Sequence, residues 1–225
     1  MERFFDIFLS SIAIFILSPL LFFVILILKL SGEGEIFFLQ ERIGKGNKTF
    51  KLYKFATMLK NSPNIGTGTI TIKDDPRVLP IGKILRKTKI NELPQLLNIL
   101  FGEMSIVGPR PLTAETFSAY SQEIQEAVSL VKPGLSGIGS IIFRDEENII
   151  SDASVSSSYY KNIISPYKGV LEKWFVLNKG KYVYFMTIFI TMWVIFLPNS
   201  KIAWKVFGNL PSPPDELKKV LNYSK

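Results

Sequence analysis

The sequence predicts an α+β fold in which an apolar N-terminal helix enters a membrane and precedes a small mixed domain. First, residues 7–28 include no charged side chain, and a helix of that length covers a hydrocarbon core of about 30 Å. Second, two alternating segments within residues 35–55 flank a short turn and predict a β-hairpin. Third, later apolar segments of helical length predict amphipathic helices that rest at a membrane interface.

The N-terminal apolar run, assigned to residues 1–30, is interrupted at its centre by Ser18-Pro19. Proline removes one backbone hydrogen bond and clashes with the preceding turn, and a serine hydroxyl can cover the freed carbonyl. The run therefore either enters and leaves through one leaflet or crosses the membrane as a kinked helix. A cleaved signal peptide is not expected, because residues 1–6 carry charges of both signs and no Ala-x-Ala site follows.

The next domain is predicted to span residues 31–200. Its hairpin pairs Glu35–Gln40 with Phe50–Phe55 through a turn at Gly44–Asn47, whose residues have turn chemistry. A further short strand is expected at Ile70–Ile72.

Helices are expected in the rest of this domain. Asn91 has the side chain of a helix N-cap, and Gly102 can end the same helix. The aromatic segment Tyr182–Leu197 is short for a membrane span, so it is either interfacial or buried. Residues 201–225 form a C-terminal tail. The other predicted helices cover residues 81–87, 112–130 and 161–177, with a loop at residues 132–137.

The composition excludes several kinds of chemistry. The 225 residues include no Cys and no His, which rules out disulfides, Cys-ligated zinc, thiolate nucleophiles and Ser-His-Asp triads. Acid–base chemistry is left to Asp, Glu, Lys or Tyr. A metal site would be rich in oxygen ligands, which suits Mg²⁺ or Mn²⁺. Hydrophobic residues make up 47% of the chain, as expected of a membrane-attached protein.

The net charge of +8 comes from one segment. Residues 41–110 hold 13 basic and 5 acidic residues, whereas the remainder is balanced. Such a segment favours a polyanion, an anionic membrane surface or a phosphorylated ligand, or else is a solvated basic face. Nucleic acid is not expected, because no nucleic-acid-binding motif is present.

Phosphate-handling side chains are the remaining candidates for chemistry. Arg110 lies between two prolines at a predicted helix start, where a stiff turn and helix N–H groups favour phosphate; a surface ion pair is the alternative. Glu92 either complements a helix dipole or holds Mg²⁺ against a pyrophosphate. Asp145-Glu146-Glu147 is a second acidic cluster or a solvated turn. The other phosphate-binding candidates are Lys54, Arg77, Arg86 and Lys87.

The ordered motifs of the chain resemble the bacterial sugar transferase family, whose members are monotopic phosphoglycosyl transferases acting on polyprenol phosphate. Each motif is weak by itself, but the ordered set is specific and extends to about Leu197. The motifs are Ser18-Pro19, Arg42-Ile43-Gly44-Lys45, Lys51-Leu52-Tyr53-Lys54-Phe55-Ala56-Thr57-Met58, Asp75-Pro76-Arg77, Leu85 to Leu96 (LRKTKINELPQL), Gly102 to Pro111 (GEMSIVGPRP) and Pro133-Gly134-Leu135-Ser136-Gly137.

The resemblance implies a re-entrant helix in one leaflet, broken at Ser18-Pro19, with both termini and the catalytic domain on the cytoplasmic face of the bacterial inner membrane. It implies transfer of a phosphosugar from a nucleotide diphosphosugar, usually a UDP-sugar, to undecaprenyl phosphate. This reaction begins the assembly of O-antigen, capsule, exopolysaccharide or protein-linked glycans. The family uses an Asp-Glu pair, in which Asp forms a covalent phosphosugar and Glu helps to bind Mg²⁺. A homodimer is one oligomeric state left open.

The chain departs from the family pattern at this pair. Asn91 stands where the family has the nucleophilic Asp, whereas Glu92 is retained. Ala56 replaces a family Arg, and Ile138-Gly139-Ser140 replaces Trp-Ala-Gln. Two further residues fall near family positions: Arg144 lies near a family Arg, and Glu172 near a family Asp.

Asn91 leaves three interpretations, because a neutral amide is a poor nucleophile. Another carboxylate attacks, from Glu92 or the cluster of Asp145, Glu146 and Glu147, with Glu172 as a further alternative. Or lipid phosphate attacks the UDP-sugar directly, since positioning and charge neutralisation accelerate phosphoryl transfer. Or the protein binds ligands without turnover and supports a partner enzyme. A protein that only binds anionic lipid is the third functional class considered.

Overall fold

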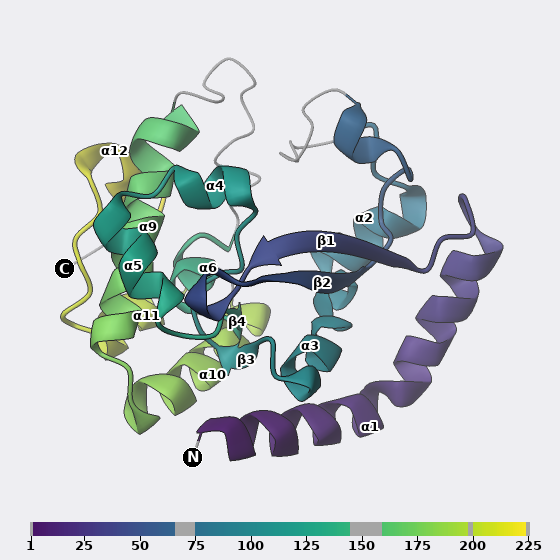
Figure 1. Ribbon diagram of the computed structural model, residues 1–225, viewed down its shortest axis with the longest axis horizontal. Helices are drawn as coiled ribbons and strands as arrows, with labels where there is room; N and C mark the ends of the chain where they lie inside the picture. The colour runs from purple at the N-terminus through teal and green to yellow at the C-terminus, as the bar shows by residue number, and fades with distance from the viewer. Residues whose placement is uncertain (1, 66–74, 145–158, 198–199, 224–225) are drawn as a thin grey trace. The chain divides into compact units, whose positions relative to one another are not determined.

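The computed structural model describes residues 2–65, 75–144, 159–197 and 200–223 and has the mixed helix-and-strand composition expected of the α+β class (Figure 1). The helices are α1 (Glu2–Leu30), α2 (Pro80–Lys87), α3 (Gln95–Phe101), α4 (Ala114–Ser118), α5 (Gln122–Ser129), α6 (Ile138–Ile142), α9 (Ser165–Leu177), α10 (Lys181–Phe196), α11 (Ile202–Val206) and α12 (Asp215–Lys218). The strands are β1 (Phe37–Ile43), β2 (Thr49–Phe55), β3 (Ser105–Val107) and β4 (Gly134–Ser136). Single helical turns are η1 (Lys45–Asn47), η2 (Ser62–Asn64), η3 (Ile90–Glu92) and η4 (Tyr160–Ile164).

The chain divides into two compact units. Unit 1 comprises Met1–Glu41 and Lys51–Gly102, and unit 2 comprises Arg42–Phe50 and Glu103–Lys225. The division passes through the β1–β2 hairpin, whose tip belongs to unit 2. The domain boundaries predicted at residues 30 and 200 stay predictions.

Helix α1 continues through Ser18-Pro19 without a break. Proline at position 19 supplies no N–H to the carbonyl of Phe15, and the Ser18 hydroxyl donates to that carbonyl at 2.8 Å instead. The expected covering of the freed carbonyl is therefore confirmed. The structure shows a helix that bends along its length (Figure 1) where the sequence predicted a break.

Near its two ends, α1 contacts other parts of unit 1, to which the helix itself belongs, whereas the middle of the helix has no buried side chain. Near its N-terminus, the Arg3 guanidinium donates to the carbonyls of Ile99 and Leu100 in the last turn of α3, and the Ile99 carbonyl also accepts the N–H of Gly102 at 3.0 Å. Near its C-terminus, Val24 and Leu28 are buried in an apolar cluster with Phe55 and Leu85. Residues 11–23 include no buried side chain.

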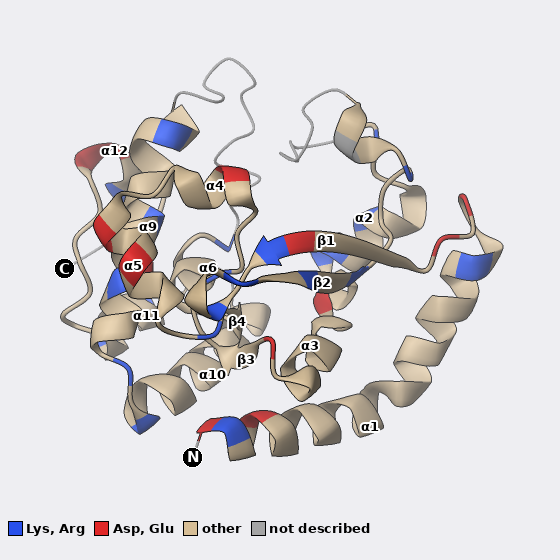
Figure 2. Cartoon of the chain, in the orientation of Figure 1, with Lys and Arg blue, Asp and Glu red and all other residues tan. Residues whose placement is uncertain are grey.

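The free face of α1 is apolar, and charged residues lie only toward the ends of the helix (Figure 2). The helix is long and apolar enough to cross a membrane, and 11% of its most apolar window is buried inside the molecule. A core helix of a soluble protein would be mostly buried, so this helix has another environment. Its exposed large side chains are Phe4, Ile7, Phe8, Ile12, Phe15, Ile16, Leu20, Phe22, Phe23, Leu26, Ile27 and Leu30.

In unit 1, the side chain of Asn98 joins α3 to β2. Asn98 is fully buried; its amide nitrogen donates to the carbonyl of Lys51 at 2.8 Å, and its oxygen accepts from the N–H of Tyr53 at 3.0 Å. The amide thus bonds the strand as a neighbouring strand would. The predicted end of α3 at Gly102 is confirmed by its left-handed conformation, with φ of 87°.

The predicted helix start at Asn91 is wrong. Residues 90–92 form the short turn η3, α3 begins only at Gln95, and the Asn91 side chain caps neither element. Lys89 enters the turn with φ of +60°, which a helix starting at Asn91 would not require. Residues 93–101 are mostly apolar, so the sequence pattern does not separate the turn at residues 90–92 from the helix that follows it.

In unit 2, β3 and β4 pair in parallel, with Ser105 opposite Gly134 and Val107 opposite Ser136. The sequence predicted only a loop at residues 132–137, because a three-residue strand has no periodicity. The predicted helix at residues 112–130 is two helices, α4 and α5, since Ser121 between them is extended. The strand expected at Ile70–Ile72 lies outside the described residues.

Helix α10 has one buried face and one exposed apolar face. The buried face includes Val183, Thr187, Ile190 and Val194, at helical spacing. The buried alternative therefore holds for one face of this segment, and the interfacial position of the other face stays a prediction. The exposed side chains are Tyr182, Phe185, Phe189, Met192, Trp193, Ile195 and Phe196.

The Asn98 link predicts a loss of stability on substitution. Asn98→Leu keeps the volume but leaves a donor and an acceptor of β2 without partners, so unfolding free energy should fall by about 2 kcal/mol. Chemical denaturation of the full chain in lipid nanodiscs measures this. Gln122→Ala, at an exposed position of α5, is the control and should change stability by no more than about 0.5 kcal/mol. An equal effect of both variants would contradict the assigned role.

Candidate active site

The predicted site residues fall into two groups, one in each unit. In unit 1, Lys54 of β2 and Glu92 of η3 form an ion pair with 3.2 Å between Nζ and Oε1. Each side chain is 18% exposed. The pair is therefore partly desolvated yet open to a ligand, and a carboxylate and an ammonium group together can meet a metal-bound phosphate.

Asn91 lies beside Glu92 and is 7% exposed. Its Oδ1 atom is buried and has no hydrogen-bond partner among the described residues. A buried amide oxygen without a partner is costly, and in native structures such an atom is commonly completed by a water, an ion or a ligand. Asn91 therefore has one buried neutral oxygen without a hydrogen-bond partner among the described residues, in the residue that precedes the retained carboxylate.

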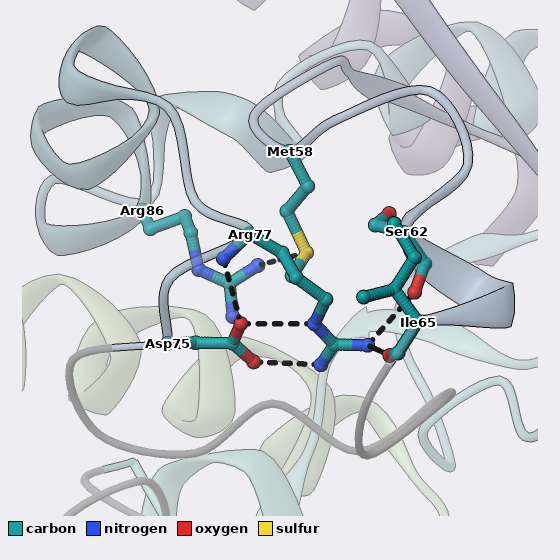
Figure 3. Close-up of polar contacts among 6 residues, drawn as sticks. All are labelled: Met58, Ser62, Ile65, Asp75, Arg77 and Arg86. Atoms are coloured by element: carbon teal, nitrogen blue, oxygen red, sulfur yellow. Dashed lines mark hydrogen bonds and ion pairs between the residues drawn. The ribbon is translucent and has the colours of Figure 1, made fainter.

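Arg77 holds the loop around it (Figure 3). Its Nε and Nη2 atoms donate to the two carboxylate oxygens of Asp75 at 2.9 and 2.6 Å, and Nη1 donates to the carbonyls of Ser62 and Ile65 at 2.8 Å each. The hydrogen bonds that Arg77 donates to the Asp75 carboxylate raise the pKa of Arg77. These contacts give Arg77 a structural function, and its contact with phosphate stays a prediction.

Arg86 of α2 lies in the same neighbourhood, with Nη1 3.9 Å from the sulfur of Met58 (Figure 3). A thioether is a weak acceptor. This contact is therefore weak, and the predicted contact of Arg86 with phosphate stays a prediction.

In unit 2, the turn that carries Arg110 is held by backbone contacts. The N–H of Gly108 donates to Ser136 at 2.9 Å, and the N–H of Gly134 donates to the Pro109 carbonyl at 2.8 Å. A Cβ on Gly134 would lie 2.0 Å from the nitrogen of Gly108, so only glycine allows this approach. The stiff turn predicted from the two prolines is therefore also clamped against β4.

The hairpin tip holds the other side of the Arg110 turn. The Ile43 N–H donates to Leu112 at 2.9 Å, and Arg42 Nη1 donates to the Pro111 carbonyl at 3.1 Å. Sequence reasoning did not assign a function to Arg42 or to Asn98. In the sequence, Arg42 follows a predicted strand by two residues, and Asn98 is an amide in a largely apolar predicted helix. These are the only features by which the two residues could have been noticed.

Glu172 of α9 lies behind the same turn and is 2% exposed. Its Oε1 accepts from the backbone N–H of Arg110 at 3.3 Å. Burial raises the pKa of this carboxyl to about 7, against the lowering effects of that hydrogen bond and of the charges on Lys168 and Arg110. Its Oε2 atom is buried and has no hydrogen-bond partner among the described residues.

A small apolar pocket in unit 2 adjoins these groups. Arg110 and Glu172 line it together with Ile43, Leu112, Phe117 and Tyr120. Its cavity volume is about 20 Å³, which is room for one water molecule. Glu172 is thus placed to support the turn and not to reach a substrate in bulk solvent.

The other predicted residues are at the edge of the described structure. Arg144 follows α6, and its Nη1 is buried without a hydrogen-bond partner among the described residues. The alternative carboxylates Asp145, Glu146 and Glu147 lie outside the described residues.

The oxygen donors of unit 1 fit a metal site that is completed by substrate phosphates and water, and they are too few to hold an ion by themselves. The described part of the chain contains no group of three or more acidic side chains that could hold an ion. Mg²⁺ is often bound by one or two carboxylates together with substrate phosphates and water. Glu92 and the unpartnered Oδ1 of Asn91 are ligands of that kind.

Comparison with known proteins identifies the family. The protein-family model described as "Bacterial sugar transferase" matches residues 1–170. The exopolysaccharide production protein ExoY of Sinorhizobium fredii is 36% identical over 175 residues, which cover 72% of this chain and 77% of that protein.

Two relatives with longer chains carry enzyme names. The UDP-N-acetylgalactosamine-undecaprenyl-phosphate N-acetylgalactosaminephosphotransferase of Aeromonas hydrophila is 39% identical over 143 residues, 63% of this chain and 34% of that protein. The UDP-glucose:undecaprenyl-phosphate glucose-1-phosphate transferase of Klebsiella pneumoniae is 38% identical over 144 residues, 62% of this chain and 30% of that protein. Because the family model matches well over half of its residues, the chain belongs to the bacterial sugar transferase family.

Proposed function

We propose that the protein transfers a phosphosugar from a UDP-sugar to undecaprenyl phosphate and thereby begins the assembly of a polysaccharide or glycoconjugate. The observation that carries this proposal is the Glu92–Lys54 pair beside Asn91, within the part of the chain that the family model matches and where the motif resemblance implies the family's Asp-Glu pair. The names of two relatives include both undecaprenyl phosphate and a UDP-sugar, which supports the same substrates here.

Glu92 and Asn91 are the residues we assign to a Mg²⁺ ion shared with the donor pyrophosphate. Such an ion would neutralise charge on the phosphoryl oxygens. Lys54 lies 3.2 Å from Glu92 and supplies a positive charge at the same place. Arg110, on a turn fixed from two sides, is assigned to a phosphate of the substrate.

Asn91 favours direct attack by the lipid phosphate over a covalent enzyme intermediate. Its amide is a poor nucleophile, Glu92 is engaged with Lys54, and Glu172 is buried against the backbone of Arg110. The same observation supports the second candidate function, a protein that binds nucleotide-sugar or lipid without turnover and assists a partner enzyme.

We further propose that α1 is re-entrant, entering and leaving one leaflet of the inner membrane from its cytoplasmic face. Arg3 and Leu28, near opposite ends of the helix, both contact unit 1. A helix that crossed the bilayer would place these ends on opposite sides of about 30 Å of hydrocarbon. The exposed apolar face of α10 is assigned to the membrane interface.

Nucleotide release tests the catalytic proposal. The purified wild type, with undecaprenyl phosphate and Mg²⁺, should release UMP from at least one UDP-sugar. Glu92→Gln should lower kcat by about 100-fold or more, since it removes a charged ligand and the partner of Lys54. Asn91→Asp is assayed alongside.

The comparison of these variants separates the two candidate functions. Turnover by the wild type excludes the non-catalytic alternative. A silent wild type with an active Asn91→Asp variant would overturn the transferase proposal and support a binding function. Chelation of the metal should abolish wild-type turnover and leave the thermal unfolding temperature within a few degrees.

Cysteine labelling tests the re-entrant helix, because the chain has no cysteine of its own. Glu2→Cys and Lys29→Cys should both react with a membrane-impermeant maleimide in inside-out vesicles, and neither should react in right-side-out vesicles. Phe15→Cys, in the exposed middle of α1, is the control and should be protected in both. Labelling of the two ends from opposite sides would exclude the re-entrant path.

A further inference from the structure

Glu172 and Gly139 meet within unit 2, on two helices that pack together. Glu172 lies in α9, and Gly139 lies in α6. A Cβ atom built on Gly139 would lie 2.4 Å from Oε1 of Glu172 and 3.2 Å from its Cδ. Real Cβ atoms essentially never approach a heavy atom as closely as the shorter of these distances, so the carboxylate occupies the space that a side chain at position 139 would need.

The oxygen in this close approach is the one that holds the Arg110 turn. Oε1 of Glu172 accepts the Arg110 N–H at 3.3 Å. Glu172 is almost wholly buried, and the pocket that it lines has room for only about one water molecule, so its carboxylate has little space in which to move aside. A methyl group at position 139 would therefore push the acceptor away from Arg110.

We propose that Gly139 and Glu172 are a matched pair that positions the Arg110 turn, in which residue 139 must lack a side chain as long as residue 172 is glutamate. Glu172 is a positioning residue, because it touches the backbone of Arg110 and not its guanidinium. The proposal deepens the proposed function, since it concerns the residue assigned there to a substrate phosphate.

Aspartate at position 172 provides the discriminating substitution. It retains the charge but is one methylene shorter, which withdraws the carboxylate from the space beside residue 139. The damage caused by Gly139→Ala should accordingly be smaller when residue 172 is aspartate. Two independent structural defects would instead add.

The test compares wild type, Gly139→Ala, Glu172→Asp and the double variant, in nanodiscs. Gly139→Ala should lower the melting temperature by about 5 °C, as expected of overpacking in a large domain. The double variant should melt above Gly139→Ala. Gly208→Ala, where a Cβ meets nothing within 4 Å, is the matched control and should melt as the wild type does.

The Arg110 amide gives a second measurement that does not need enzymatic activity. Selective ¹⁵N-arginine labelling yields signals from six arginines, and Arg110→Lys assigns the relevant one. The chemical shift of the Arg110 amide should change in Gly139→Ala. In the double variant it should lie close to its value in Glu172→Asp. If Gly139→Ala leaves both this signal and the melting temperature unchanged, or if its effects add to those of Glu172→Asp, the pair is refuted.

The kinetic measurement then connects the pair to turnover. The kcat/KM of Gly139→Ala for the UDP-sugar should fall at least tenfold, and the double variant should recover most of the loss relative to Glu172→Asp. If the amide signal recovers in the double variant but the wild type shows no turnover, the proposed pairing of Gly139 with Glu172 stands. Only the proposed transferase function is then refuted.

The pH dependence of the Arg110 amide is a separate prediction. The groups that act on the Glu172 carboxyl are Lys168 on the same helix and Arg110 on the turn; α6 has no charged residue, and Glu123 of α5 is paired with Lys173. With its pKa raised to about 7, Glu172 should be protonated below that pH and ionised above it. The Arg110 amide should therefore titrate near pH 7 in wild type.

Glu172→Gln removes the titrating group while keeping the size of the side chain. In this variant the Arg110 amide should not respond to pH between 5 and 8. The wild type should lose stability as pH rises from about 4.5 to about 7, because the folded state there binds the proton that the unfolded state has released. An unchanged titration in Glu172→Gln would show that another group acts on Arg110.

Discussion

The contact between Arg3 and the last turn of α3 connects the apolar helix α1 to the candidate site residues of unit 1. Helix α3 holds β2 through the Asn98 amide, and β2 carries Lys54. Lys54 pairs with Glu92 of η3, which Leu93 and Pro94 separate from α3. These contacts connect α1 to the Glu92–Lys54 pair through α3 and β2 within unit 1.

The charge of this pair determines what the amide of Asn91 would mean for the proposed reaction. Glu92 and Lys54 are together neutral, and the Asn91 amide adds no charge. An aspartate at position 91 would make the group negative and would require a cation before an anionic donor could approach. In the proposed direct reaction, Asn91 would therefore supply no nucleophile but would repel an anionic donor less than an aspartate would.

Local sequence patterns predicted those elements whose cause is local. The hairpin followed from alternation around a polar turn, the end of α3 from the left-handed freedom of Gly102, and the Ser18 hydrogen bond from the missing N–H of Pro19. The chemistry of phosphate binding pointed to Glu92 and Arg110, whereas Glu172 came only from the family resemblance.

Contacts between distant residues were not predictable in the same way. The pairing of β3 with β4 joins segments about 30 residues apart, and the Asn98 link reaches 47 residues along the chain. The start of α3 was misplaced because the Asn91 side chain looks like a cap while its backbone belongs to a separate turn. Gly139 carries no local signal, since the atom that excludes a side chain there comes from α9.

The length of chain between Arg3 and its partners has a consequence for synthesis. The carbonyls of Ile99 and Leu100 are 96 and 97 residues downstream, and at 5–20 residues per second a ribosome needs about 5–20 s to make that length. During this interval the N-terminal end of α1 has no α3 to bind. In the proposed membrane position the bilayer would hold the nascent helix first, and the rest of unit 1 would then fold onto a helix that is already embedded.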